Sequence, residues 1–122
     1  MPTRIVVAGC RDYSNYIEAK EYIDSCIATL NIQGEIIIIS GGARGADKLG
    51  ERYAKEMGYK TEYYLPDWES YGRSAGPIRN AEMAKAGDVI ICFWDGISRG
   101  TKSMINSAKK HEKIVMVKTI TV

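Results

Sequence analysis

The stretch IIIISGGARGADKLGE, which runs from Ile36 to Glu51, contains the signals that decide the fold. Its four isoleucines stop at Ser40, and five of the next six residues are glycine or alanine. A β-branched run with an abrupt end is typical of a buried strand. From Ala46 onward the pattern turns helical. The stretch therefore predicts a strand, a tight turn and a helix, which is the repeating unit of parallel sheets.

The rest of the chain repeats this alternation of apolar runs and amphipathic segments. Strands are predicted at Arg4–Gly9, Glu35–Ser40, Thr61–Leu65, Asp88–Trp94 and Lys113–Val122. Helices are predicted at Asn15–Leu30, Ala46–Met57, Pro77–Ala86 and Arg99–His111, with a loop at Pro66–Ser74. Such alternation favours an α/β fold with helices on both faces of a five-stranded parallel sheet. The 122 residues suit one domain that covers residues 1–122.

The apolar character of each strand indicates its place in the sheet. Thr61–Leu65 is the least apolar strand and suits an edge, whereas Arg4–Gly9 and Asp88–Trp94 are continuously apolar and suit the centre. We therefore favour the strand order 3-2-1-4-5. The flavodoxin-like order 2-1-3-4-5 is the alternative.

Composition limits the classes of protein to which the chain can belong. The net charge of +2 is too small to indicate a nucleic-acid partner by itself. The three cysteines are odd in number and fit no zinc pattern, so we expect no metal site and a reducing, cytoplasmic location. We expect no signal peptide, because only a short apolar run follows Arg4. No apolar run reaches the roughly 20 residues of a membrane span.

Glycine and arginine gather in the loops that follow the predicted strands. These loops read GCRDYSN, SGGARGAD, PDWESYGRSAGPIRN and WDGISRGTKS, and each contains at least one glycine and one arginine. The turns at the opposite edge, NIQGE, EMGYK, AKAGD and HEK, show no such pattern. Open parallel sheets bind ligands outside the carboxyl ends of their strands, where the strand order reverses. The four loops therefore predict a binding site at that edge.

The residue types in these loops point to a phosphorylated ligand. Glycine lets backbone N–H groups approach a ligand, a helix N-terminus attracts anions, and arginine binds them in a bidentate manner. Tight turns also use glycine without any ligand, and Asp47 either accepts hydrogen bonds from a ribose or favours the helix dipole. The predicted ligand-binding residues are Gly9, Arg11, Ser40, Gly41, Gly42, Arg44, Asp47, Gly76, Arg79, Asn80, Trp94, Ser98, Arg99, Gly100 and Thr101.

Known nucleotide fingerprints are absent from the sequence. GGARG is not G-x-G-x-x-G, and nothing matches G-x-x-x-x-G-K-[ST]. An ordinary NAD-dependent dehydrogenase and a P-loop NTPase are therefore disfavoured, and we expect no obligatory cofactor. We expect a nucleotide-like small molecule instead. The sequence leaves a homo-oligomer open.

Aromatic and acidic residues in the same loops supply further candidates. Tyr13, Trp68, Tyr71 and Trp94 are candidates to stack on a base, and Trp94 is favoured because it ends a central strand. The catalytic candidates are Asp12, Asp47 and Asp95, but their spacing singles out no pair.

Four stretches in order resemble one protein family. GCRDY, SGGARGADKLGE, DWESYGRSAGPIRNAEM and FWDGISRGTKSMI are similar to the YspA/YpsA-related (YAcAr-type) branch of the SLOG superfamily. The resemblance covers nearly the whole chain. It implies a Rossmann-like three-layer sandwich and a nucleotide or nucleotide-derived ligand. It also implies a family that is frequent in phages and mobile elements.

Two relatives within that superfamily separate three hypotheses. The lonely-guy phosphoribohydrolases carry G-G-x-G-T-x-x-E with a catalytic glutamate, and SRGTKSM places Met104 at that position. The resemblance therefore favours a module that binds an ADP-ribose-like molecule or a nucleotide second messenger, over a hydrolase of N-glycosidic or phosphate bonds. DNA-processing protein A has a loop similar to SGGARGAD. That protein binds single-stranded DNA, so single-stranded nucleic acid stays an alternative partner. It is less favoured, because the net charge of +2 indicates no basic surface.

Overall fold

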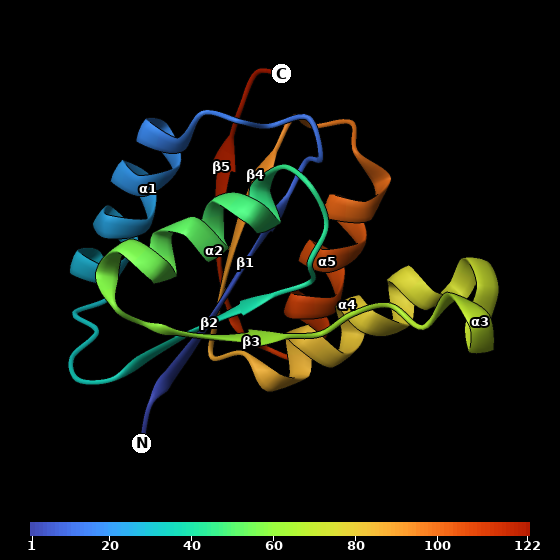
Figure 1. The fold of residues 1–122 in the computed structure, drawn as a ribbon, viewed down its shortest axis with the longest axis horizontal. Coiled ribbons are helices and arrows are strands. Elements are labelled where there is room, and N and C mark those ends of the chain that lie inside the picture. The colour runs from blue at the N-terminus through green and yellow to red at the C-terminus, as the bar shows by residue number, and fades with distance from the viewer.

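Strands and helices alternate along the chain in the computed structural model, which describes residues 1–122 (Figure 1). The strands are β1 (Thr3–Gly9), β2 (Ile36–Ser40), β3 (Lys60–Tyr63), β4 (Val89–Trp94) and β5 (Ile114–Thr119). The helices are α1 (Tyr16–Thr29), α2 (Ala46–Met57), α3 (Trp68–Tyr71), the 3₁₀ turn η1 (Gly72–Ser74), α4 (Ala75–Ala86) and α5 (Arg99–Lys110).

The five strands form one parallel sheet in the order β3-β2-β1-β4-β5. The predicted fold class and strand order are confirmed, and the flavodoxin-like order is wrong for this chain. β1 lies at the centre, with Ile5 opposite Ile38 of β2 and Val89 of β4. The strand order reverses between β1 and β4, because the chain builds outward through β2 and β3 before it returns to β4.

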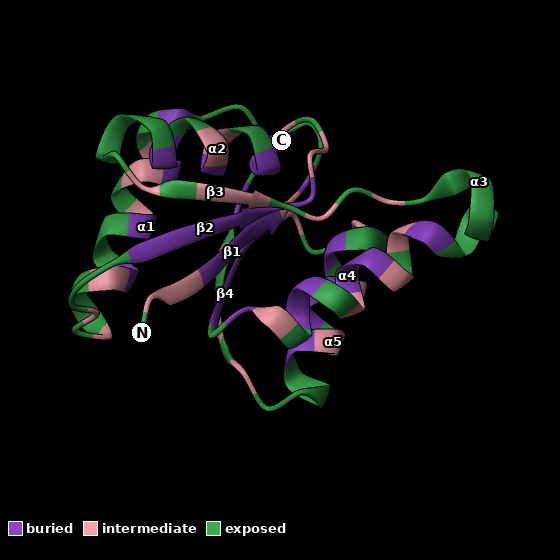
Figure 2. Cartoon of the chain, turned by 60° about the horizontal axis from the view of Figure 1, so that its bottom comes forward, coloured by how far each residue is buried: buried purple, intermediate pink, exposed green.

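Helices cover both faces of the sheet and enclose two apolar cores. On one face, α1 and α2 pack with alternate strand residues such as Ile5, Ile38 and Phe93. On the other face, α4 and α5 pack with the intervening residues, including Val6 and Ile90. Alternation of this kind follows from the two-residue period of a strand. β2 and β4 are continuously buried apart from Trp94, which is why their sequences are apolar at almost every position (Figure 2).

The segment after β3 differs from the prediction of a loop at Pro66–Ser74. It contains α3 and η1, and α3 extends away from the sheet beyond α4 (Figure 1). The side chain of Asp67 caps α3, since its Oδ1 accepts a hydrogen bond from the Ser70 N–H at 3.1 Å. η1 then continues directly into α4, which begins at Ala75. The predicted start at Pro77 is therefore two residues late, and Pro77 still lies in the first turn, where a missing N–H is tolerated.

Two sequence predictions concern the pairing of the cysteines and the length of the helices. Cys10, Cys26 and Cys92 are buried and unpaired. No helix combines the length and the apolar character that crossing a bilayer requires.

Candidate functional site

A cleft of about 430 Å³ opens at the carboxyl ends of β1 and β4, where the strand order reverses. The loops after β1, β2 and β4 and the helix α4 all contribute to its walls. Eleven predicted residues line it: Gly9, Arg11, Asp12, Arg44, Asp47, Arg79, Asn80, Asp95, Ser98, Gly100 and Thr101. The topology therefore brings residues from three loops and from α4 to one place, as the switch-point rule leads us to expect.

Six predicted residues lie outside this cleft. Gly41 and Gly42 line an adjoining cavity of about 490 Å³, which also contains Leu65, Pro66 and Trp68. The others, Ser40, Gly76, Trp94 and Arg99, line neither cavity. Arg11, Ala43, Arg44 and Arg79 line both cavities and so form their common wall.

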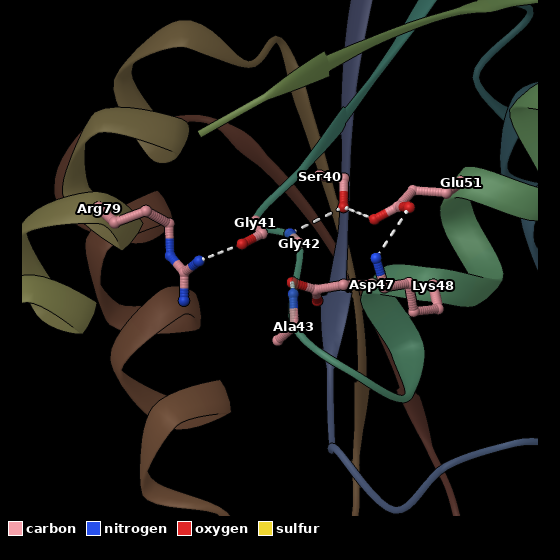
Figure 3. Close-up of polar contacts among 8 residues, drawn as sticks. All are labelled: Ser40, Gly41, Gly42, Ala43, Asp47, Lys48, Glu51 and Arg79. Carbon is pink, nitrogen blue, oxygen red and sulfur yellow. Dashed lines mark hydrogen bonds and ion pairs between the residues drawn. The ribbon is translucent and has the colours of Figure 1, made fainter. Parts of the chain in front are cut away.

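Two backbone N–H groups of the turn after β2, those of Gly42 and Ala43, donate to side chains of the chain itself (Figure 3). The Ser40 hydroxyl accepts from the Gly42 N–H at 3.1 Å and donates to Glu51 at 2.6 Å. Asp47 accepts from the Ala43 N–H at 3.2 Å. Both N–H groups therefore have partners within the chain before any ligand binds. Ser40 and Glu51 serve to shape the turn.

Arg79 and Asp47 flank Gly41 and leave no room for a side chain there. A Cβ on Gly41 would lie 2.5 Å from Arg79 Nη1 and 2.9 Å from Asp47 Oδ2. Gly45 has a φ of +79°, and a Cβ there would lie 2.4 Å from the carbonyl oxygens of Cys10 and Arg11. Packing within the chain therefore requires both glycines. The interpretation that a ligand must lie against them is not needed to explain their presence.

Arg79 is buried in α4 and joins three parts of the site. Its Nη1 donates to the Gly41 carbonyl oxygen at 2.6 Å, and its Nε donates to Asn80 Oδ1 at 3.0 Å. The Asn80 amide in turn lies 3.4 Å from the Gly100 carbonyl oxygen at the start of α5. Because α4 begins at Ala75, Arg79 and Asn80 occupy its second turn rather than the predicted first turn. Arg79 thus fixes the position of the loops.

Asp47 is the most perturbed carboxyl group in the cleft. The side chain is 5% exposed, and burial raises the pKa of Asp47 to about 6. The hydrogen bond from Ala43 and the charge of Arg79 oppose that rise in pKa. A carboxyl group of this kind changes its protonation state near neutral pH, which is a property of many general acids and bases.

The other carboxylates at the cleft have cationic or N–H partners. Asp12 pairs with Arg44 at 3.3 Å, although both side chains are more than 70% exposed. Asp95 accepts from the N–H groups of Ile97 and Ser98, both at 2.8 Å, which lowers the pKa of Asp95. Arg11 has no ion-pair partner within 4.0 Å. Arg79 likewise has no ion-pair partner within 4.0 Å, so the cleft holds positive charge on both Arg11 and Arg79.

Unpaired backbone N–H groups at two helix starts add to this positive character. In the first turn of α2, the N–H groups of Asp47 and Lys48 donate no hydrogen bond within the chain. In the first turn of α5, the same holds for Arg99 and Gly100. Helix N-termini carry about half a unit of positive charge. Both helices therefore begin where an anion would be stabilised.

Cys10 and Met104 form the floor of the cleft. Met104 is 1% exposed and belongs to the core between α5 and the sheet. Cys10 Sγ lies 4.0 Å from Thr101 Oγ1, and burial raises the pKa of Cys10. A raised pKa suppresses the thiolate, so Cys10 acts here as an apolar packing residue.

Among the aromatic candidates, the structure separates packed residues from exposed ones. Trp94 is half-buried, and its Nε1 donates to the Ser98 carbonyl oxygen at 3.0 Å. Tyr13 is buried and stacks on Phe93, with ring centroids 5.1 Å apart. Trp68, which the sequence did not favour, is 53% exposed and lines the adjoining cavity. Its position depends on α3, which the sequence prediction lacked.

Comparison with known proteins places this architecture in a family. Residues 3–71, more than half of the chain, match the YspA, cpYpsA-related SLOG family. The chain belongs to this SLOG family. The Gene 61 protein of Mycobacterium phage D29 is 40% identical over 81 residues. That similarity spans 62% of this chain and 65% of the phage protein, which is less than two thirds of its length.

A solved structure supports the fold of this SLOG chain. DNA processing protein A (DprA) from Streptococcus pneumoniae superimposes with a TM-score of 0.74 at 18% identity. The superposition covers 100% of this chain and 52% of DprA, so the chain corresponds to about half of that protein. At this identity the likeness concerns the fold alone. The match with a phage protein agrees with the expectation of a family frequent in phages.

Proposed function

We propose that the chain binds a nucleotide or a nucleotide-derived molecule, such as ADP-ribose, in the cleft at the carboxyl ends of β1 and β4. In this role it acts as a sensor or a sequestering module. The observation that carries the proposal is the meeting of Arg11 and Arg44 with the starts of α2 and α5 at one cleft. Phosphate groups are stabilised by guanidinium groups and by free helical N–H groups.

The carboxylates of the cleft favour a sugar phosphate over a simple polyphosphate. Asp12 and Asp47 lie beside the arginines, and both line the cleft. Carboxylate oxygens accept hydrogen bonds from ribose hydroxyls but repel phosphate. A ligand with a phosphate at Arg11 and hydroxyl groups near the carboxylates satisfies both sets of groups. A nucleotide has this composition.

The test is a ligand screen by thermal shift, followed by calorimetry. AMP, ATP and ADP-ribose are compared with inorganic phosphate and with an oligothymidylate, each at low and high salt. A nucleotide at a hundred times its dissociation constant stabilises the folded chain by roughly 2.7 kcal/mol. A screen in which no nucleotide raises the melting temperature contradicts the proposal. Preferential binding of the oligothymidylate, with steep loss of affinity in salt, indicates a single-stranded nucleic-acid binder instead.

A second candidate is a hydrolase that cleaves an N-glycosidic or phosphate bond in the same ligand. Asp47 favours it, because a buried carboxyl group with a pKa near 6 is suited to general acid–base catalysis. The discriminating measurement is product analysis of each nucleotide that binds. An unchanged ligand after prolonged incubation supports the binding module, and turnover that is lost in Asp47→Asn supports the hydrolase.

A further inference from the structure

The cavity beside the cleft combines an apolar wall with a cationic wall. Leu65, Pro66 and Trp68 form the apolar wall, and Arg11 and Arg44 belong to the side shared with the cleft. The Leu65 side chain packs on Gly42, where a Cβ would lie 2.6 Å from Leu65 Cδ2. The glycine turn therefore separates two cavities that share the same pair of exposed arginines.

Trp68 is accessible to a ligand, and its ring lies close to the start of α4. It is 53% exposed, and its Nε1 donates no hydrogen bond within the chain. A Cβ on Gly76 would lie 3.7 Å from Cη2 of Trp68, so the ring lies against α4. Trp94, by contrast, is half-buried and donates to Ser98. Of the two tryptophans, only Trp68 presents a free aromatic surface next to a cavity.

The exposed apolar surface around Trp68 has no role in the core. Leu65 is 68% exposed, and α3 contains no buried residue (Figure 2). Exposed apolar groups at the rim of a cavity mark binding surfaces. Nucleobases stack favourably on tryptophan rings. Every base can do so, because each has an aromatic face. The neighbouring arginines require that the same ligand carry negative charge.

We propose that the ligand is a dinucleotide whose linking phosphates lie at the shared wall of Arg11 and Arg44. One nucleoside occupies the cleft, and the base of the other stacks on Trp68 in the adjoining cavity. This proposal rests on the proposed nucleotide-binding function and names the ligand class. Each cavity, at about 430 and 490 Å³, has the size of a small-molecule site.

The test compares one-base and two-base probes on matched variants. Calorimetry measures the affinities of AMP and diadenosine diphosphate for the wild type, Trp68→Ala and Tyr71→Ala. Tyr71 is the control, because it lies on the same short helix, is 52% exposed and lines neither cavity. We expect the wild type to bind the dinucleotide more tightly than AMP. Trp68→Ala should weaken dinucleotide binding by about 5- to 150-fold, which is the loss of one base–tryptophan stack, while Tyr71→Ala should leave it unchanged.

A fluorescence measurement provides a second readout on an intact Trp68. In Trp94→Phe, Trp68 is the remaining tryptophan, since the chain has two. We expect saturable quenching of its emission by diadenosine diphosphate.

The outcomes separate this proposal from the proposed function. Equal affinities of AMP and the dinucleotide, or unaltered dinucleotide binding in Trp68→Ala, overturn the dinucleotide proposal and leave nucleotide binding in place. A wild type that binds neither probe contradicts both. An oligothymidylate that binds more tightly than the dinucleotide identifies a polymer as the occupant.

Discussion

Arg79 of α4 donates a hydrogen bond of 2.6 Å to the carbonyl oxygen of Gly41, in the turn after β2. The guanidinium is buried, and the same nitrogen lies 3.4 Å from the Tyr64 carbonyl oxygen. The bond therefore connects a helix on one face of the sheet to the ends of two neighbouring strands. An arginine that sequence reasoning placed among the ligand contacts also holds the site together.

Replacement of Arg79 by methionine tests this structural role. The variant keeps the aliphatic part of the side chain but loses the charge-assisted hydrogen bond to Gly41. We expect the free energy of unfolding to fall by roughly 1.5–3 kcal/mol, as measured by urea denaturation. Arg73→Met is the matched control, because Arg73 is exposed and makes no hydrogen bond within the chain. If Arg79→Met instead kept the wild-type stability and lost nucleotide binding, Arg79 would be a ligand contact rather than a structural residue.

Replacement of Gly41 by alanine should also destabilise the fold. The new methyl group would meet Arg79 Nη1 at 2.5 Å, and neither Arg79 nor Asp47 can move without breaking a hydrogen bond. Overpacking of this kind costs about 1–3 kcal/mol, again measured by denaturation. Gly100→Ala is the control, because a Cβ on that glycine meets nothing within 4 Å. Equal stability of the two variants would show that the turn tolerates a side chain.

Arg44→Ala should change binding and leave folding intact. Arg44 is exposed, and its ion pair with Asp12 is 3.3 Å long at the surface, where such pairs contribute little. We expect the melting temperature to stay within measurement error of the wild type. The affinity for the best-binding nucleotide of the screen should fall about tenfold or more, since a charged hydrogen bond contributes roughly 1.5–3 kcal/mol. Arg73→Ala, measured by the same calorimetry, should bind as the wild type does.

Asp47 should make stability depend on pH in the opposite sense to a carboxylate whose pKa is lowered on folding. Its pKa rises from 3.8 to about 6 on folding, so the folded chain holds the proton more tightly than the unfolded chain. The resulting stabilisation is full below pH 4 and is lost as the pH rises through 6. At about 1.4 kcal/mol for each pKa unit, the loss is about 3 kcal/mol.

The measurement is urea denaturation of the wild type and Asp47→Asn at several pH values from 4 to 7. The asparagine oxygen can still accept from Ala43, so we expect the variant to lack this decline. Asp95→Asn is the control, because the pKa of Asp95 is lowered from 3.8 and its stabilisation is lost only below that pH, so this variant should keep the wild-type decline between pH 4 and 7. Identical pH profiles for the wild type and Asp47→Asn would mean that Asp47 is ionised normally.

The chain should not release free base from nucleoside monophosphates at an enzymatic rate. Met104 stands where lonely-guy enzymes have their glutamate and is buried in the core, and the single histidine, His111, ends α5 away from the cleft. Loss of a positioned acid–base group lowers rates by about 10²–10⁴-fold. Chromatography of AMP incubated with the protein measures free adenine. Turnover of about 1 s⁻¹ or faster would contradict the binding module and direct mutagenesis to Asp12, Asp47 and Asp95.

The sequence by itself determined the five strands, the four longer helices, the parallel sheet and the edge at which the cleft lies. Each of these depends on local patterns: the isoleucine run of β2, the helical period of α2, and a glycine and an arginine in each loop after a strand. The strand order could also be predicted from the sequence, because β3 (Lys60–Tyr63) is less apolar than β1 and β4. The periodic spacing of apolar residues is a local property of the chain, so a single sequence is enough to recognise it.

Only the tertiary structure decided which of these residues are free to meet a ligand. Arg44 and Arg79 look alike in sequence, yet one is exposed and the other is buried against the Gly41 carbonyl. Trp94, the favoured stacking candidate, is half-buried and donates to Ser98, whereas Trp68 is exposed beside a cavity. Gly50 interrupts a helical pattern, and it allows close packing of α2 on β1, because a Cβ there would lie 2.6 Å from Cβ of Val7. These outcomes depend on contacts between residues distant in sequence, and it is such contacts that fix the burial and the remaining hydrogen-bonding capacity of each side chain.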